Sequence, residues 1–279
     1  MQREQLSSRL GFLMLSAGCA IGVGNVWKFP WLTGQNGGGI FVLSYLCFLI
    51  LLGLPVMTME FSVGRAAQKS PVCMYQQIEP PGSKWHWHGY AALIGNVVLM
   101  MFYSVVSGWM LYYLVSSVSG TLASLDAKAV GGFFGAMLSS APTVTFYTVI
   151  TVIGAFIILS FPLRTGLETV SKWMMGLLFV LMVFLALHSL FLDGAREGLT
   201  FYLLPDFSKF TSATVVAAMN QAFFSLSIGI GSMAIFASYI NKDQSLVKES
   251  ASVIALDTVV AVLAGLIIFP ACFTYGVKP

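Results

Sequence analysis

The stretch AGCAIGVGN, residues Ala17 to Asn25, decides how the whole chain is interpreted. It lies in a long apolar run, yet it places glycines at Gly18, Gly22 and Gly24 and ends in an amide side chain. A glycine inside a helix costs about 1 kcal/mol relative to alanine. These glycines therefore need a reason, and the rest of the sequence offers two.

The composition shows which solvent surrounds this run. Hydrophobic residues make up 57% of the 279 residues and charged residues only 9%, a balance typical of a chain that lies in a bilayer. A helix needs roughly 20 residues to cross the hydrocarbon core. Apolar windows of that length occur at about residues 10–33, 40–60, 89–118, 142–163, 173–192, 212–240 and 250–276. We expect an all-α membrane protein with seven transmembrane helices, since Ile40 to Met59 lacks the alternation of a barrel strand.

The basic residues predict the orientation, because lysine and arginine accumulate at the cytoplasmic ends of spans. On one side fall Arg3, Arg9, Arg65, Lys69, Lys84, Arg164, Lys172, Lys242 and Lys248. On the other side fall Lys128, Arg196, Lys209 and Lys278. We therefore expect a multi-pass protein of the cell (cytoplasmic) membrane with a cytoplasmic N-terminus, which with seven spans puts Pro279 outside.

The glycines of the first span have two interpretations. Gly18 and Gly22 form a GxxxG pair of the kind that lets two helices touch closely. Alternatively, the helix is unwound there, which a bilayer tolerates only where the freed backbone groups line an enclosed cavity or a ligand. Freed carbonyls would then bind a cation, and the following half-helix would present a partial positive charge to an anion.

A second interruption favours the unwound helix. The sixth window contains SLSIGIGS, Ser225 to Ser232, which includes the polar residue Ser227, and Asn220 and Gln221 stand shortly before it. Spans one and six correspond if residues 1–192 form a first five-helix repeat and residues 193–279 begin a second one. Paired glycine-interrupted spans indicate a secondary transporter with its binding site near the bilayer midplane.

Ionisable residues inside spans are expensive and are functional candidates by default. Lys28 lies just above the first interruption, Glu60 at the end of the second span and Asp257 within the seventh. Lys28 could instead extend to the interface, and Glu60 could lie among headgroups. His86 and His88 resemble a metal-ligand pair only faintly, because no cysteine or carboxylate stands near them in sequence.

Several long motifs together resemble the neurotransmitter:sodium symporter family. They are GNVWKFP at residues 24–30, NGGG at 36–39, PVMTMEFSVGR at 55–65, and the region from QAFFSLSIGIG to SYINKDQ at 221–244. The resemblance implies the broken-helix 5+5 inverted-repeat fold and sodium-coupled symport. Members of the family have eleven or twelve spans, so the resemblance also implies a chain whose second repeat is incomplete.

The resemblance also implies which residues bind the ligands. For sodium they are Gly18, Ala20, Ile21, Asn25, Ser225 and Asp257. For the substrate they are Cys19, Gly22, Val23, Gly24, Leu99, Tyr103, Phe224, Ser227 and Ile230. Monoamine transporters of the family have an aspartate at the position of Gly22, so glycine implies a substrate with its own carboxylate. We therefore expect a neutral amino acid with an aliphatic or aromatic side chain.

Two positions depart from the family pattern. Asp257 stands where an asparagine is usual, and the chloride of chloride-dependent relatives lies near positions matching Tyr45, Gln221 and Ser225. A carboxylate at Asp257 could replace that chloride, so we expect chloride-independent transport. Lys28 stands at the outer gate in place of the usual arginine, which keeps the charge but loses the bidentate fork.

Other functional classes stay open. We expect the chain to be a fragment of the full transporter, and the alternative is a truncated, transport-inactive membrane protein that associates with a full-length partner. A seven-helix receptor or channel fits the orientation less well, and no Ser-His-Asp or HExxH arrangement suggests an enzyme. The expected partners are an amino acid, sodium ions and the lipid bilayer, with neither a nucleic acid nor an organic cofactor among them.

Overall fold

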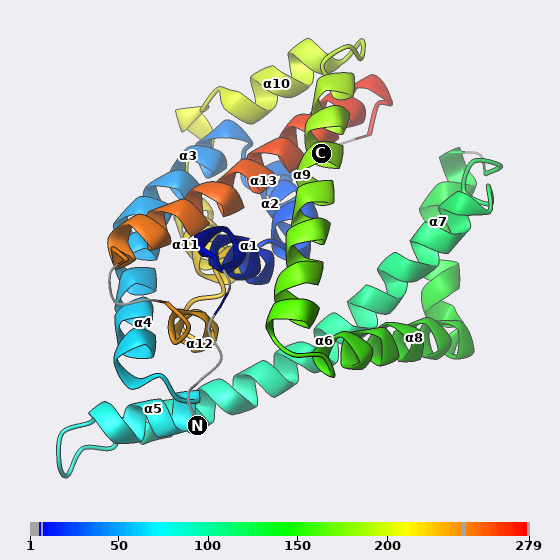
Figure 1. Cartoon of the computed structure of the whole chain (residues 1–279). Helices are drawn as coiled ribbons and strands as arrows, with labels where there is room; N and C mark the ends of the chain where they lie inside the picture. Colours follow the sequence, from blue (N-terminus) through cyan, green and yellow to red (C-terminus); the bar gives the residue numbers. More distant parts are fainter. Residues whose placement is uncertain (1–5, 7, 126, 241–243, 278–279) are drawn as a thin grey trace. The chain divides into compact units, whose positions relative to one another are not determined.

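The computed structural model describes residues 6, 8–125, 127–240 and 244–277. Arg3, Lys242, Lys278 and Pro279, which entered the orientation argument, lie outside these residues, as does the side chain of Lys128. The chain divides into two compact units, Met1–Ala92 with Glu168–Pro279, and Leu93–Leu167 (Figure 1). This division does not test the repeat boundary at residue 192, which stays a prediction.

The first unit is helical throughout most of its length. Its elements are α1 (Arg9–Ala20), the π-helix η1 (Gly24–Lys28), α2 (Phe29–Gln35), α3 (Gly39–Phe48), the π-helix η2 (Leu49–Gly53), α4 (Leu54–Ala67), α5 (Pro71–Ile78), α9 (Thr169–Ser189), α10 (Ala195–Leu203), the 3₁₀ turn η4 (Phe207–Lys209), α11 (Ser212–Ser225), α12 (Ser232–Ala237) and α13 (Leu246–Thr274). The helix α6 (His86–Val118) begins in this unit, and the π-helix η3 (Arg164–Glu168) ends in it.

Within the described residues, five helices are long and apolar enough to cross a membrane. They are Gly39–Ala67, His86–Val118, Ala141–Leu159, Arg164–Ser189 and Leu246–Thr274, and a sixth results if α1 and the bent segment Gly24–Gln35 are one span. The predicted span over residues 212–240 is not a continuous helix. It is divided into α11 and α12, which together with the intervening residues account for the sixth window.

Both interruptions predicted from the glycines are present. The axis bends by 54° between α1 and the helix that follows it, and α1 ends where Ile21 adopts an extended backbone. The second interruption contains positive φ angles at Gly229 and Gly231 and also at Ser227, where φ is 52°. A left-handed serine is uncommon, so its surroundings must hold it in place.

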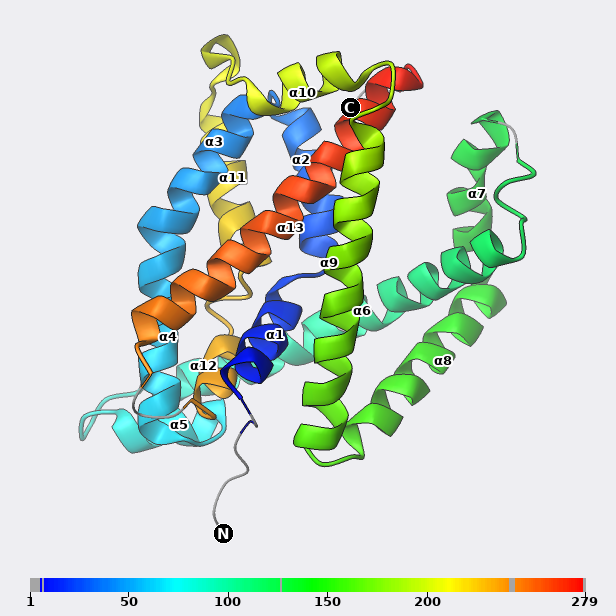
Figure 2. The same ribbon diagram turned by 45° about the horizontal axis from the view of Figure 1, so that its top comes forward.

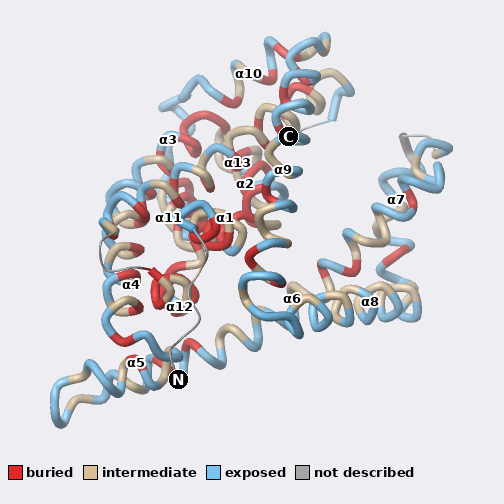
Figure 3. The backbone as a smooth tube through the Cα atoms, viewed as in Figure 1, coloured by how far each residue is buried: buried red, intermediate tan, exposed pale blue. Residues whose placement is uncertain are grey.

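A buried cluster in the first unit fixes the two interruptions relative to the unbroken helices. Large side chains such as Phe29, Tyr45, Phe61 and Tyr202 are fully buried in it. Figure 2 shows α13 running beside α9 and crossing in front of α11, and Figure 3 shows the buried positions of this unit gathered where these helices meet α1. The interruptions therefore lie in the interior of the unit.

The second unit contains the rest of α6 with α7 (Ala127–Ser139) and α8 (Ala141–Leu159). Tyr112 of α6 stacks on Phe133 of α7 with ring centroids 5.5 Å apart, and it meets Tyr147 of α8 edge to face at 5.3 Å. A Cβ on Gly108 would lie 2.7 Å from the backbone nitrogen of Thr148, so glycine permits α6 and α8 to touch. None of the residues of α8 is buried, as expected of a helix that faces lipid.

Candidate functional site

Asn25 connects the first interruption to α13. Its Oδ1 accepts a hydrogen bond from the Gly22 amide at 3.3 Å, which satisfies a donor that the broken helix leaves open. Its Nδ2 donates to Oδ1 of Asp257 at 2.8 Å and to the Asp257 carbonyl at 3.2 Å. Asn25 and Asp257 are both fully buried, so this amide joins two spans that are 232 residues apart in sequence.

The second oxygen of Asp257 accepts from two hydroxyl groups. Ser225, the last residue of α11, donates to Oδ2 at 3.0 Å, and Tyr45 of α3 donates to it at 3.3 Å. The two hydroxyl oxygens lie 3.0 Å from each other. Four buried side chains from η1, α3, α11 and α13 thus form one polar cluster.

When Asp257 is ionised, this cluster carries a negative charge that the described ion pairs do not balance. Those pairs join Arg9 to Glu249, His86 to Glu79, Lys172 to Glu168 and Lys209 to Asp206, and none includes Asp257. A buried carboxylate with only neutral hydrogen-bond donors is costly unless a cation compensates it. Its oxygen atoms are the type of ligand that hard cations prefer.

The first interruption also contains backbone carbonyl oxygens, a few residues before Asn25 in the sequence. Among the described residues, no hydrogen bond outside the helices ends on the carbonyl oxygen of Ala20 or Ile21. Buried carbonyls are nearly always paired, so these two are candidate cation ligands. Gly18 and Ile21 also line a cavity of about 400 Å³ against α9, whose contributors include Ser171, Met174 and Met175.

Gln221 links the two interruptions directly. This fully buried residue of α11 donates from Nε2 to the carbonyl of Gly24 at 2.9 Å. Its side-chain amide oxygen, Oε1, is buried and has no hydrogen-bond partner. An unpartnered buried acceptor of this kind needs an explanation such as a ligand or an ordered water.

Two further contacts hold the second interruption. Ser227 donates from Oγ to the carbonyl of Cys19 at 3.3 Å, which ties its left-handed backbone to α1. The Glu60 carboxylate of α4 accepts a hydrogen bond from the Gly229 amide. Glu60 therefore binds freed backbone rather than lying among headgroups, a role that the sequence reasoning missed because nothing in the local pattern relates residue 60 to residue 229.

Lys28 and Phe224 lie together beside the first interruption. The Lys28 Nζ is 3.6 Å from the centroid of the Phe224 ring, a cation–π contact. A Cβ on Gly24 would lie 3.0 Å from the same ring. The absence of a side chain at Gly24 thus lets Phe224 pack against the break.

The structure brings most of the predicted residues together but not all of them. Gly22, Val23 and Ile230 lie within the two interruptions and are partly exposed. Leu99 and Tyr103 belong to the second unit, so their contact with a substrate stays a prediction. Glu79, seven residues before His86, lies with its carboxylate 2.8 Å from the His86 Nδ1. The described residues contain no group of three metal-ligating side chains.

Two interrupted helices around a buried polar cluster define a broken-helix secondary transporter. The sequence matches the family described as "SNF: Sodium:neurotransmitter symporter family" over residues 3–129 and 134–275. The chain belongs to this family, which confirms the resemblance. It is a family of sodium-dependent transporters and not of enzymes.

Individual relatives agree with this assignment. An uncharacterized sodium-dependent transporter of Bacillus subtilis, YhdH, is 38% identical over 275 residues, covering 99% of this chain and 61% of the relative. One from Haemophilus influenzae is 37% identical and is covered to 63%. The crystal structure of MhsT in complex with L-phenylalanine matches with a TM-score of 0.92 and 39% identity, over 100% of this chain and 63% of MhsT.

These matches confirm an all-helical transporter fold and a multi-pass membrane protein. They also show a difference in length, since the chain spans 61% and 63% of the two curated relatives described here. The part of the fold that this chain covers includes both interrupted helices.

Proposed function

We propose that this chain takes part in sodium-coupled symport of a neutral amino acid across the cell membrane, with its N-terminus in the cytoplasm. The observation that carries the proposal is the buried cluster of Asn25, Tyr45, Ser225 and Asp257, in which a carboxylate without a cationic partner lies beside a broken helix. A transported sodium ion would compensate this charge.

The family resemblance implies two sodium positions at the break. In the first, the ion binds the Ala20 carbonyl, Asn25, Ser225 and Asp257. In this structure Asn25 and Ser225 donate hydrogen bonds to Asp257. When the ion binds, their side chains would reorient so that their oxygen atoms face it. In the second, the carbonyls of Gly18 and Ile21 supply part of the shell, and the remaining ligands come from a later span of a longer protein.

The substrate would lie between the two interruptions. Gly22 leaves room for a substrate carboxylate, which the amides near Val23 and Gly24 and the Tyr103 hydroxyl would bind. Cys19, Leu99, Phe224, Ser227 and Ile230 would surround the amine and the side chain. MhsT was crystallised with L-phenylalanine, which supports an aromatic or aliphatic amino acid here.

Asp257 also bears on chloride. The family resemblance implies that chloride-dependent relatives hold the anion near positions matching Tyr45, Gln221 and Ser225. The hydroxyl groups of Tyr45 and Ser225 donate to Asp257 here. A fixed carboxylate supplies the negative charge that chloride would bring. We therefore propose that transport is independent of chloride.

We also propose that residues 1–192 form the first repeat and residues 193–279 the beginning of the second. A second candidate function is a transport-inactive membrane protein that associates with a full-length partner. The observation that favours it is the open cavity that Gly18 and Ile21, predicted to bind the second sodium, line on α9.

Binding of radiolabelled phenylalanine and leucine to the purified chain in detergent tests the proposal. We expect binding in sodium that disappears in potassium and in the variant Asp257→Ala. Thr258→Val is the matched control, because the Thr258 hydroxyl bonds only to the Ile254 carbonyl of its own helix. Sodium-independent binding, or displacement by dopamine or serotonin in preference to leucine, would contradict the proposal, and a folded chain that binds neither ion nor amino acid would favour the inactive partner.

A further inference from the structure

The turn that joins α5 to α6 is closed by a contact between its two ends. Glu79 directly follows α5, and His86 is the first residue of α6. The Glu79 carboxylate accepts a hydrogen bond from the His86 amide at 3.0 Å and lies 2.8 Å from the His86 Nδ1. Pro80 and Gly82, whose φ is 83°, turn the chain between them (Figure 1). We call this contact the clasp, and α5 with the start of α6 the hairpin.

The two helices of the hairpin also touch at its other end. A Cβ on Gly89 of α6 would lie 2.7 Å from the Cα of Val72 and 3.0 Å from the carbonyl oxygen of Pro71, so glycine lets α6 lie directly on the first turn of α5. Between these two points, the ring of Tyr75 meets that of His88 edge to face, with centroids 4.9 Å apart. The angle between α5 and α6 is therefore fixed at the clasp and at the Gly89 contact.

The open end of the hairpin holds the end of the second interruption. Gly231 directly precedes α12 and has a φ of 74°. A Cβ built on it would lie 3.6 Å from the Cβ of Pro71 and 3.8 Å from that of Ala92, which are ordinary contact distances, so Gly231 lies against both helices. Met74 of α5 is fully buried in a cluster with Ala234 of α12. A change in the hairpin angle therefore moves the surface against which Gly231 and α12 pack.

The strength of the clasp depends on the charge of His86. A carboxylate only accepts hydrogen bonds, so Nδ1 carries its hydrogen in both charge states and Nε2 is the atom that gains a proton. Histidine side chains change charge near neutral pH, and the charged ring makes the stronger bond to a carboxylate. Desolvation opposes ionisation of Glu79, but the amide and ring of His86 outweigh it and lower the pKa of this carboxyl, which therefore keeps its charge at neutral pH.

Other titratable groups also lie on the hairpin. Burial and then the charge of Glu60 raise the pKa of Tyr75, so this phenol stays neutral near pH 7. Cys73, Lys84 and His88 belong to none of the described ion pairs. Of those pairs, the one between Glu79 and His86 is the one that lies on the hairpin.

We propose that Glu79 and His86 are positioning residues of the second interruption, because a proton on His86 strengthens the clasp and so steadies the hairpin that holds Gly231 and α12. Loss of this proton as the pH rises loosens the contact. The clasp acts on the backbone of the interruption whether or not a ligand is bound. Since the proposed amino acid site includes this interruption, binding there becomes weaker at higher pH, a last step that rests on the proposed function.

Hydrogen exchange of the purified chain in detergent tests this proposal without a ligand. The amide of Gly229 donates to Glu60 and that of Ile235 to the Gly231 carbonyl, so peptides that contain them report on the interruption. Their exchange is followed by mass spectrometry at about pH 6 and about pH 8 and is corrected for the intrinsic effect of pH on the chemical step. We expect the corrected exchange to be about threefold faster at the higher pH, an effect of the size that a partly exposed ion pair supports.

Variants separate the charge of His86 from its packing. His86→Lys keeps a cation opposite Glu79 at both pH values and should give slow exchange at both. His86→Gln keeps a hydrogen-bond donor without the charge and should give fast exchange at both, as should Glu79→Gln. His88→Gln, two residues further along the same helix, is the matched control and should keep the pH dependence of the parent chain.

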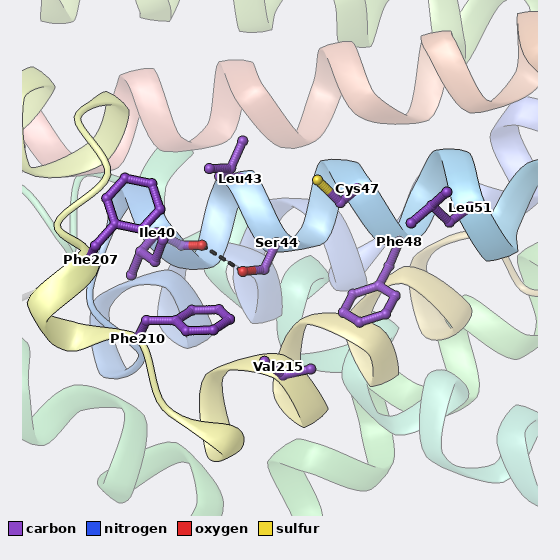
Figure 4. A pocket seen from close by; sticks show the side chains of 9 residues that line it. All are labelled: Ile40, Leu43, Ser44, Cys47, Phe48, Leu51, Phe207, Phe210 and Val215. Atoms are coloured by element: carbon purple, nitrogen blue, oxygen red, sulfur yellow. Dashed lines mark hydrogen bonds between the residues drawn. The ribbon is translucent and has the colours of Figure 1, made fainter.

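A second control removes a hydrogen bond elsewhere in the same unit. The Ser44 hydroxyl donates to the Ile40 carbonyl one turn earlier in α3 at 2.8 Å, in the wall of an apolar groove of about 310 Å³ (Figure 4). Ser44→Ala removes no titratable group, so it should also keep the pH dependence.

Equal corrected exchange at the two pH values in the parent chain overturns the proposal, and this result needs no variant to fold. A pH dependence that persists in His86→Lys, or that disappears in His88→Gln, overturns it as well. A chain that binds no amino acid would contradict the proposed function and would still show these exchange rates, so the two proposals fail separately.

Discussion

The contact between α4 and α12 makes a sharp prediction at Gly64. A Cβ at this position would lie 2.0 Å from the carbonyl oxygen of Ala234 and 2.8 Å from its Cα. Ala234 belongs to α12, the short helix that begins directly after the second interruption. For ordinary contact, which begins at 3.4 Å, the oxygen would have to retreat by about 1.4 Å.

The expected cost follows from which atoms collide. They are backbone atoms of a buried residue, which cannot rotate away as a side chain would. Overpacking of this kind typically costs about 1–3 kcal/mol, while alanine returns up to about 1 kcal/mol of helix propensity. We expect Gly64→Ala to lose about 2 kcal/mol of stability, which lowers the Tm by about 4–8 °C in a domain of this size.

Thermal unfolding in detergent measures this shift. The control is Gly154→Ala in the interior of α8, where a Cβ would have no neighbour within 4 Å. That variant should be unchanged or more stable by up to about 1 kcal/mol. The sodium-dependent binding of an amino acid should also weaken in Gly64→Ala, since α12 would move away from the second interruption. Equal Tm values for the two variants would refute the proposed close contact.

Three further predictions concern single side chains. Arg9→Ala removes the guanidinium that lies 2.7 Å from the Glu249 carboxylate, and the Glu249 side chain is only 3% exposed. We therefore expect the free energy of unfolding to fall by about 1–3 kcal/mol. In thermal unfolding, the double variant Arg9→Ala/Glu249→Gln should largely recover this loss. Partial burial opposes ionisation of Glu79, but the amide and ring of His86 outweigh it and lower the carboxyl pKa. The stability that this contact contributes is therefore present above the ordinary glutamate pKa and is lost as the pH falls through the lowered pKa. Hydrogen exchange at the His86 amide should show this acid dependence in the parent chain but not in Glu79→Gln. Asp257→Asn should make amino acid binding depend on chloride or abolish it, and unchanged binding without chloride would refute the surrogate role.

The position of the two interruptions could be predicted from sequence because glycine is a local signal. Gly18, Gly22 and Gly24 stand where a span should favour helix formers, and the structure bends the chain there by 54°. The conformation of Ser227 could not be predicted in this way. Its positive φ depends on a contact with the Cys19 carbonyl, 208 residues away, and serine itself does not favour that conformation.

Only part of the polar cluster could be predicted from the sequence. The charge of Asp257 inside an apolar span marked it as functional without any partner being known. Its contacts with Asn25, Tyr45 and Ser225 were implied by the family resemblance, since no pattern within one span relates residue 257 to residue 25. Glu60 shows the limit of such reasoning, because its partner is a backbone amide, which has no identity in the sequence.

The balance of donors and acceptors at the interruptions explains why a cation, rather than an anion or a water molecule, is the expected ligand of the cluster. Two of the freed amides are already satisfied, since Gly22 donates to Asn25 and Gly229 donates to Glu60. The groups that face the cluster include oxygens, namely the carbonyls of Ala20 and Ile21 among the described residues and the carboxylate of Asp257. A hard cation can compensate an excess of buried acceptors with a net negative charge, whereas another acceptor cannot. Removing the charge of Asp257 should therefore weaken sodium binding more than removing any single hydroxyl group of the cluster.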